Sequence, residues 1–346
     1  MVADVAVVDE VRVPRVLVVI VNFRTANLAI AGVKSVIEEQ QRSGFDVRTV
    51  VVENQSGDEA ALRAGLDGLP GVTLIVAERN GGFSYGNNLG FKFAYESGWI
   101  PDYFHLLNPD ARLNPGGLTE LVRFLEKHPA AGIAGSRFTD ATGAEWPVAF
   151  RFPSLFSELD YGLRVGVISS LLQKWVVAQQ MPNVPTLIDW LPGASMMVRR
   201  EVVEQLGGMD EEYFLYFEET DFCLKAKRAG WETWHVPSSS VMHIAGQSTG
   251  VTAAGSHGRP LPGYWFESRS RYFRKNHGRV YAALADAIAV GTGLLGNVKE
   301  IAIGRKPKPK FIQGLTRQAL RGLREGTPPI ETKLPLENTT AKNSAG

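Results

Sequence analysis

The chain has few of the features that mark secreted, membrane-spanning or nucleic-acid-binding proteins. Cys223 is the single cysteine among 346 residues, so no intramolecular disulfide can form, as is typical of reducing, cytoplasmic compartments. Lys and Arg number 37 against 36 Asp and Glu, and this balance gives no general attraction to nucleic acid. We therefore expect a cytoplasmic globular protein without a nucleic-acid partner.

Long apolar runs are missing as well. Residues 1–14 contain acids where a signal peptide needs basic residues, and we interpret them as a leader that precedes the fold. The nearest approach to a membrane span, residues 280–296, is interrupted by Asp286 and falls short of the roughly twenty residues required. We predict a packed or surface-lying helical segment over 279–304 and a disordered tail over 305–346.

Strand-like and helix-like segments alternate through the first 135 residues. Runs rich in Val, Ile and Leu are typical of strands buried on both faces, and the stretches between them carry apolar residues at helical spacing. This alternation predicts an α/β fold with a mostly parallel, twisted sheet flanked by helices. The expected strands are residues 16–23, 47–52, 72–77, 103–107 and 131–135.

The second half of the chain has a less regular pattern. Residues 151–188 predict helix and loop, and residues 246–263, rich in Gly, Ser and Pro, predict a mobile loop or lid. Further elements are expected as strands over 190–198, 232–237 and 239–244 and as a helix over 218–229.

Polar residues follow four of the expected strands. They stand at or after the point where each strand ends: Asn22, Glu53-Asn54, Asn80 and Asn108–Asp110. Asn and Asp end strands in any protein because they form turns. Four such ends nevertheless indicate one shared cleft, because ligands of open α/β sheets bind beyond the carboxyl ends of the strands.

Two further groups could carry chemistry. Acids crowd the start of the helix over 218–229, and a carboxylate against an apolar wall can have a raised pKa and act as a base. Residues two apart on a helix point to nearly opposite sides, so Glu219 and Asp221 cannot both face one cleft. His243 together with Asp110 would form a partial ligand shell for Mg²⁺ or Mn²⁺.

The chain lacks the sequence motifs of other nucleotide-binding protein classes. No G-x-x-x-x-G-K-[ST] loop is present, and the glycine-rich residues 80–90 do not follow the first strand as a dinucleotide fingerprint would. Residues 264–278 mix basic and aromatic side chains. This mixture favours contact with phosphates or lipid headgroups over nucleic acid.

The motifs occur in a familiar order. VVIVNF, VVENQSGD, NGGFSYGNN, LLNPDARL, the stretch from WLPGASMMV to EETDFCLKAKRAGW, and HIAGQSTG together resemble inverting family 2 glycosyltransferases of the GT-A fold. Within that family the chain is most similar to bacterial rhamnosyltransferase-type members that build cell-surface polysaccharide. The resemblance runs from Val16 to Gly278 and implies a GT-A domain over residues 15–278.

The resemblance assigns roles to individual residues. Asp110, the remaining acid of the family's D-x-D element, and His243 would hold Mg²⁺ or Mn²⁺. Residues 218–221 match the family's Glu-Asp-x-Asp, with Glu219 as the aligned catalytic base and Asp221 as the alternative. The contacts to the nucleotide sugar would come from Glu53, which would read the base, and from Asn22, Asn80, Gly82, Asn87, Asn108, Asp110, Gly193 and Ala194.

The implied reaction moves a sugar, rhamnose among the candidates, from a dTDP- or UDP-sugar to a cell-surface glycan or lipid-linked acceptor. Peripheral contact with the inner face of the plasma membrane would bring the enzyme to such acceptors. Two alternatives stay open: a catalytically silent relative that binds nucleotide sugars, and a sugar nucleotidyltransferase. The departures from the family pattern at Asn108 and Glu219 keep the first alternative open.

Overall fold

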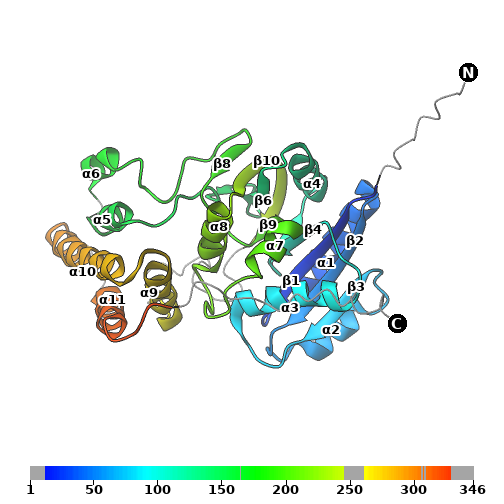
Figure 1. The fold of residues 1–346 in the computed structure, drawn as a ribbon, viewed down its shortest axis with the longest axis horizontal. Helices are drawn as coiled ribbons and strands as arrows, with labels where there is room; N and C mark the ends of the chain where they lie inside the picture. The colour runs from blue at the N-terminus through cyan, green and yellow to red at the C-terminus, as the bar shows by residue number, and fades with distance from the viewer. Residues whose placement is uncertain (1–11, 164, 245–260, 305–306, 308, 329–346) are drawn as a thin grey trace, which may run out of the picture.

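The computed structural model describes residues 12–163, 165–244, 261–304, 307 and 309–328. Its centre is a mixed sheet in the order β3-β2-β1-β4-β9-β6-β10-β5, with β7 beside β6 and β8 beside β10 (Figure 1). The strands are β1 (Arg15–Asn22), β2 (Asp46–Glu53), β3 (Val72–Val76), β4 (Tyr103–Leu107), β5 (Ala111–Leu113), β6 (Ala131–Thr139), β7 (Glu145–Trp146), β8 (Thr186–Ile188), β9 (Ser195–Arg199) and β10 (Glu232–His243). The helices are α1 (Ala26–Ser43), α2 (Glu59–Leu66), α3 (Gly82–Glu96), α4 (Gly117–Lys127), α5 (Leu155–Leu163), α6 (Gly166–Leu171), α7 (Arg200–Leu206), α8 (Glu218–Arg228), α9 (Gly263–His277), α10 (Arg279–Ala302) and α11 (Pro309–Gly322).

The long strands run in one direction apart from β9. β3, β2, β1 and β4 are parallel neighbours, and β10 is parallel to β6. β9 lies antiparallel between β4 and β6. The predicted α/β fold with helices around a mostly parallel sheet is confirmed, and the five strands expected in the first 135 residues are β1, β2, β3, β4 and β6.

Helices cover both faces of the sheet because alternate side chains of a strand point to opposite sides. In β1, Val18 and Ile20 pack with α1, α2 and α4, whereas Leu17 and Val19 pack with α3, α7 and α8. All four side chains are fully buried, and each contributes about 1.5–3 kcal/mol of hydrophobic stabilisation. Two-sided burial is the reason that β1 is apolar without interruption. Cys223, a buried free thiol, belongs to the second of these cores.

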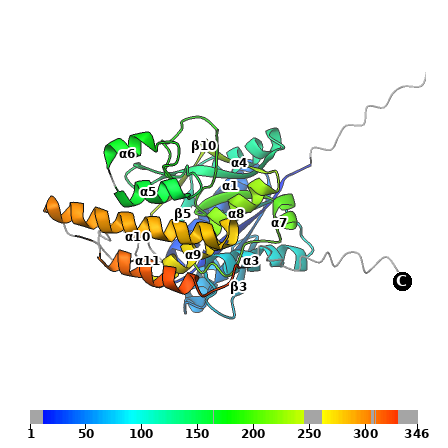
Figure 2. The ribbon, with the colours of Figure 1, turned by 60° about the vertical axis from the view of Figure 1, so that its left-hand side comes forward.

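A further group of helices, here called the helical lobe, consists of α5, α6, α9, α10 and α11. It lies at the end of the molecule opposite β3 and α2, and α10 runs alongside α11 (Figures 1 and 2). α10 packs against α5, α9 and α11. Tyr272 and Phe273 of α9 join the lobe to α8 through a cluster that includes Leu224.

Two strand predictions need correction. The strand expected over 190–198 begins only at Ser195, because Trp190 forms an isolated bridge with Phe150 and the chain turns before β9. The two strands expected over 232–237 and 239–244 are the single strand β10. Its pairing with β6 shifts in register between Val236 and Ser240, and the shift accommodates Pro237, which has no N–H to donate.

The prediction of disorder after residue 304 is wrong for Pro309–Gly322, which forms α11. Ile312 and Leu315 are buried on one face of this helix, and Leu315 packs with Phe266 and Ala289. Tertiary packing therefore orders a segment whose composition alone indicated disorder. Residues 1–11 of the expected leader, 246–260 of the expected lid and 329–346 of the expected tail lie outside the described residues.

Candidate active site

A cavity of about 380 Å³, here called the donor cavity, opens where the parallel strands end. Asn54, Asn80 and Gly82, which follow β2 and β3, line it together with Asn108 and Asp110, which follow β4. Parallel strands end at the same edge of a sheet, and this brings the segments together. Polar residues from three of the four strand ends expected to share a cleft therefore meet at this cavity.

Asn22 and Glu53 lie beneath this cavity instead of on its wall. They are 0% and 2% exposed. Asn22 Nδ2 donates to Asp58 Oδ2 (2.9 Å), and Glu53 Oε1 accepts from the backbone N–H of Ser56 (2.6 Å). Both side chains therefore hold the loop after β2, and neither lines the cavity. Asn87 is likewise fully buried and does not line the cavity.

Two asparagines shape the glycine-rich turn before α3. Asn54 Nδ2 donates to Asn80 Oδ1 and to the Gly82 carbonyl oxygen, both at 3.1 Å. Gly82 has a φ of 82°, and a Cβ there would lie 1.9 Å from the Phe214 carbonyl oxygen, so only glycine fits. The sequence placed Asn54 among the polar strand ends, but no contact to the nucleotide sugar was assigned to it.

Asp110 and His243 meet although they are far apart in the chain. β5 pairs antiparallel with β10, and His243 lies opposite Ala111, next to Asp110. His243 Nε2 lies 3.2 Å from Asp110 Oδ1 and 3.5 Å from Asn108 Nδ2. Within the described part of the chain, no three or more His, Cys, Asp or Glu side chains form a metal-binding group. The carboxylate and imidazole fit a partial shell for Mg²⁺ or Mn²⁺ that a ligand's phosphate oxygens would complete.

Glu219 is held by the backbone that leads into β9. Its Oε1 accepts a hydrogen bond from the N–H of Gly193 at 3.0 Å. A Cβ at position 193 would lie 2.5 Å from the Phe83 ring and 3.2 Å from this oxygen, so a larger residue would crowd the carboxylate. Burial raises the pKa of the Glu219 carboxyl, and the Gly193 N–H opposes the rise by stabilising the charged form. Ala194, the next residue, is also buried.

Glu218 lines the donor cavity as well, and no role was expected for it. Its side chain is 2% exposed, and its Oε2 has no hydrogen-bond partner among the residues that the structure describes. Burial, and then the charge of Glu219, raise the pKa of Glu218 well above its usual value. Acids are common at helix starts, so the position of Glu218 in the sequence gave no sign that its side chain is buried.

The two residues before α8 have a strained backbone. Tyr216 and Phe217 have φ values of 70° and 67°, in the left-handed region that residues other than glycine rarely adopt. Such a conformation costs about 1–3 kcal/mol per residue and persists only where the surroundings impose it. The strain lies where the chain turns to present Glu218 and Glu219, as is common at functional sites.

Asp221 faces away from Glu219. Its Oδ2 accepts from Lys275 Nζ (2.6 Å) and its Oδ1 from Asn276 Nδ2 (2.7 Å). Lys275 Nζ also donates to Asp210 Oδ2 at 2.7 Å. The helix thus separates Glu219 from Asp221, as the two-residue spacing predicted. Asp221 lines neither the donor cavity nor its neighbour, so the alternative assignment of Asp221 as the base does not fit the geometry.

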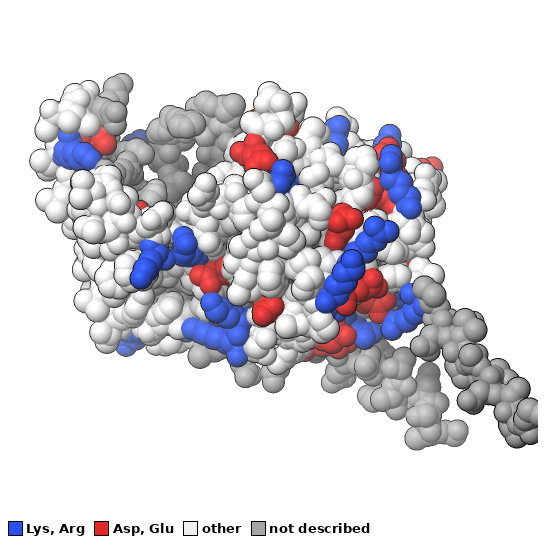
Figure 3. Space-filling model, turned by 90° about the horizontal axis from the view of Figure 1, so that it is seen from above, with Lys and Arg blue, Asp and Glu red and all other residues white. Residues whose placement is uncertain are grey.

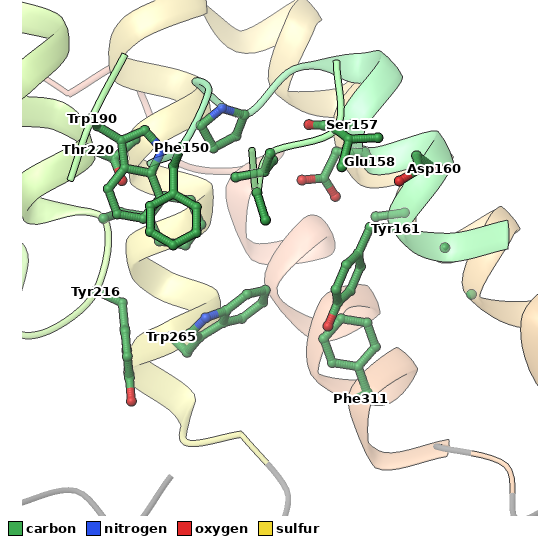
Figure 4. Close-up of a pocket in the computed structure, with 18 of the residues that line it drawn as sticks. Phe150, Ser157, Glu158, Asp160, Tyr161, Trp190, Tyr216, Thr220, Trp265 and Phe311 are labelled. Atoms are coloured by element: carbon green, nitrogen blue, oxygen red, sulfur yellow. The ribbon is translucent and has the colours of Figure 1, made fainter. Parts of the chain in front are cut away.

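A second cavity, of about 700 Å³, adjoins the donor cavity and is here called the lobe cavity. Four residues line both spaces: Asn108, Tyr216, Glu219 and His243. The lobe cavity extends among α5, α9, α10 and α11, and its aromatic lining is formed by Phe150, Tyr161, Trp190, Tyr216, Phe217, Trp265 and Phe311 (Figure 4). Glu219 therefore lies where two separate spaces meet.

The mostly parallel sheet flanked by helices, with Asp110 and His243 paired at its strand ends, is consistent with the GT-A fold. Solved structures share this fold. The mannosyltransferase PcManGT from Pyrobaculum calidifontis, in complex with GDP-Man and Mn²⁺, aligns over 90% of this chain and 88% of its own, with a TM-score of 0.54 and 16% identity. GalNAc-T7 with UDP, GalNAc and Mn²⁺ aligns over 90% of this chain and 58% of its own, with a TM-score of 0.56 and 15% identity.

Residues 14–259 match the family described as Glycosyltransferase like family 2, and the chain belongs to this family. The N-acetylglucosaminyl-diphospho-decaprenol L-rhamnosyltransferase of Mycobacterium tuberculosis is 29% identical over 217 residues, which span 58% of this chain and 68% of the relative. Rhamnosyltransferase WbbL of Escherichia coli is 26% identical over 185 residues, 53% of this chain and 65% of the relative. The chain is therefore a rhamnosyltransferase-like member of the family.

Proposed function

We propose that this protein transfers a sugar, with rhamnose as the leading candidate, from a dTDP- or UDP-sugar to a glycan or lipid-linked acceptor and inverts the anomeric carbon. One observation carries the proposal: the carboxylate of Glu219 lies where the donor cavity and the lobe cavity meet. A transferase needs such a junction because it must bring two substrates to one base. We assign the reaction to a domain spanning residues 15–278.

The donor side of the reaction belongs to the strand ends. The turn at Asn80 and Gly82 would receive the nucleotide diphosphate, with Asn54 holding that turn in shape. Asp110 and His243 would hold Mg²⁺ or Mn²⁺, which would stabilise the charge of the leaving diphosphate. Glu53 and Asn22 support the neighbouring loop from below.

The acceptor side belongs to Glu219. The acceptor hydroxyl enters from the lobe cavity and attacks the anomeric carbon, while the bond from that carbon to the diphosphate oxygen breaks on the opposite face. Glu219 accepts the hydroxyl proton, and the Gly193 N–H orients its carboxylate. A raised pKa makes this carboxylate a stronger base than an exposed one. Attack opposite the leaving group accounts for inversion.

The test is a transfer assay on the purified chain with dTDP- and UDP-sugars, Mn²⁺ and lipid-linked or soluble glycan acceptors. Glu219→Gln should lower kcat by about 10²–10⁴, because general base catalysis contributes that much. Donor binding, measured by thermal shift, should be retained. Glu96→Gln is the matched control, since Glu96 lies on the exposed end of α3 with 63% of its side chain accessible.

The alternatives give different results in the same assays. Full turnover by Glu219→Gln would refute its role as the base, and turnover unaffected by EDTA or by Asp110→Ala would refute the metal pair. Binding of nucleotide sugars without transfer to any acceptor would identify a catalytically silent relative. Diphosphate release from a nucleoside triphosphate and a sugar phosphate would identify a nucleotidyltransferase.

A further inference from the structure

One side of the lobe cavity lies outside the family match. The matched residues end at 259, whereas α9, α10 and α11 begin at Gly263 and form one side of the cavity. Along α10 the lining residues Ala289, Gly293, Asn297 and Glu300 recur at helical spacing, so this wall extends about 16 Å. The cavity is therefore long, and its far side is built by a part of the chain that the family model does not cover.

Apolar and aromatic side chains dominate the lining. Trp190 stacks on Phe150 with ring centroids 4.5 Å apart, and Trp265 packs on Phe311 at 5.9 Å (Figure 4). Among the described lining residues there is no Lys or Arg. Three acids besides Glu219 line the space: Glu158 is paired with Arg269 at 2.8 Å, and Asp160 and Glu300 lie on the α5 and α10 sides. Such a space offers no cation to a phosphate, whereas it removes a hydrocarbon from water.

We propose that the lobe cavity binds the hydrocarbon chain of a lipid-linked acceptor, with the head group of that acceptor at Glu219. The inference rests on the proposed function, because it assigns the second substrate of the same reaction. Asn108, Glu219 and His243 form the polar end of the cavity and suit the head group. From there the chain extends along α10 into the helical lobe.

The outer surface of the lobe supports this assignment. Leu294, Leu295 and Val298 lie on the same stretch of α10 as the cavity wall, and they are 53%, 61% and 65% exposed. Apolar side chains exposed in this way are suited to contact with a lipid bilayer. A lobe that touches the bilayer can take up an acceptor chain with little exposure of that chain to water.

Isothermal titration calorimetry of the full chain with geranyl, farnesyl and geranylgeranyl glucoside, below their aggregation limits, tests the proposal, because an uncharged head group suits a cavity whose described lining has no Lys or Arg. Each isoprene unit that enters the cavity should tighten Kd by at least about tenfold, because every buried CH₂ favours binding. Binding should also show a negative heat-capacity change. Ala178→Trp should abolish the increase in affinity with chain length. Ala178 is an exposed residue on the cavity wall, and a large side chain there fills the space.

Val184→Trp is the matched control, because Val184 is 64% exposed and does not line the cavity, and it should keep the gain. Equal Kd values for all three chain lengths, or an Ala178→Trp protein that keeps the gain, would overturn the proposal. Binding of an uncharged oligosaccharide that Ala178→Trp abolishes, without a chain-length effect, would also overturn it and assign the cavity to a glycan. Thermal shifts with nucleotide sugars and Mn²⁺ are measured in parallel on the unmodified chain. If the proposed function is wrong, no donor binding will be seen; if only the lipid proposal is wrong, donor binding will remain.

Discussion

At the start of α8, two neighbouring carboxyl groups have different surroundings. Glu219 accepts a hydrogen bond from Gly193, whereas Glu218 Oε2 is buried without a partner. Burial raises the pKa of both groups, and the charge of Glu219 raises that of Glu218 further. The first carboxylate is thus oriented for proton transfer, while the second destabilises the folded state when it is ionised.

We predict that Glu218→Gln raises the free energy of unfolding at neutral pH by about 1–3 kcal/mol, the usual cost of a buried group without a partner. The folded-state pKa is raised above 4.5, so the stability associated with protonated Glu218 is full below pH 4.5 and is lost as the pH rises toward the folded value. Urea unfolding of both proteins across this range should give equal values at the acid end and a growing difference above it. A stability difference between the two proteins that does not change with pH would contradict the destabilising role of ionised Glu218.

At the scale of elements, α8 is fixed to α9 by a buried ion cluster. Lys275 bridges Asp210 and Asp221 at 2.7 and 2.6 Å, and Arg271 binds Asp210 at 2.8 Å. Burial alone would raise the pKa of Asp210, but the ammonium of Lys275 and the guanidinium of Arg271 lower it overall. The cluster holds the helix that carries Glu219, so we interpret Asp221 as a positioning residue.

Asp221→Ala should therefore lower the free energy of unfolding by about 3 kcal/mol, because it leaves part of the charge of Lys275 buried and unpaired. Glu267→Ala, which breaks the exposed pair of Glu267 and Arg321, should cost no more than about 1 kcal/mol. Urea unfolding measures both. If Asp221→Asn instead abolished transfer without any change in stability, Asp221 would have to act in the chemistry.

At the scale of the whole molecule, charge and apolar surface are distributed differently. On the face shown in Figure 3, Lys and Arg side chains alternate with Asp and Glu, and no broad area of one sign is visible. α10, with 24 residues, has the length and composition of a candidate membrane span, and only 22% of its most apolar window is buried in the protein. Its exposed apolar residues are Val280, Leu284, Leu294, Leu295, Val298 and Ile301.

We propose that α10 lies on a membrane surface and makes the enzyme peripheral to it. The double variant Leu294→Glu/Leu295→Glu should weaken co-sedimentation with phosphatidylglycerol-containing vesicles by at least about tenfold, because two apolar anchors become charged. Leu187→Glu is the control, since Leu187 is 54% exposed but lies on β8, outside the lobe. An unmodified chain that stays in the supernatant with vesicles at low salt would refute this placement.

The hydrophobic pattern of the sequence predicted secondary structure well where the residues of a segment are buried in a regular way. The strands β1, β2, β3, β4 and β6 could be predicted because each contains an apolar run, which in β1 is buried on both faces. The separation of Glu219 from Asp221 followed from helical geometry. The start of β9, the continuity of β10 and the existence of α11 could not be predicted. Each depends on a partner distant in the chain, respectively Phe150 against Trp190, β6 against β10, and Phe266 against Leu315.

Side-chain direction at the strand ends was the other limit. The sequence placed polar residues at four ends, but only the tertiary structure shows that Asn22 and Glu53 point into the loop below the cavity while Asn54 and Asn80 line it. The reason is that one residue more or less at the end of a strand turns a side chain to the other side. Motif order alone cannot resolve a difference of this size.

The sequence by itself determined the α/β fold, the family resemblance and the likeness to rhamnosyltransferases, because these depend on periodic burial and on the order of short motifs. Only the tertiary structure decided that Asp110 meets His243, that Glu219 lies between two cavities, and that Glu218 is buried without a partner. These features arise from pairing and packing between segments far apart in the chain, and the energy of such contacts is not written in any local pattern.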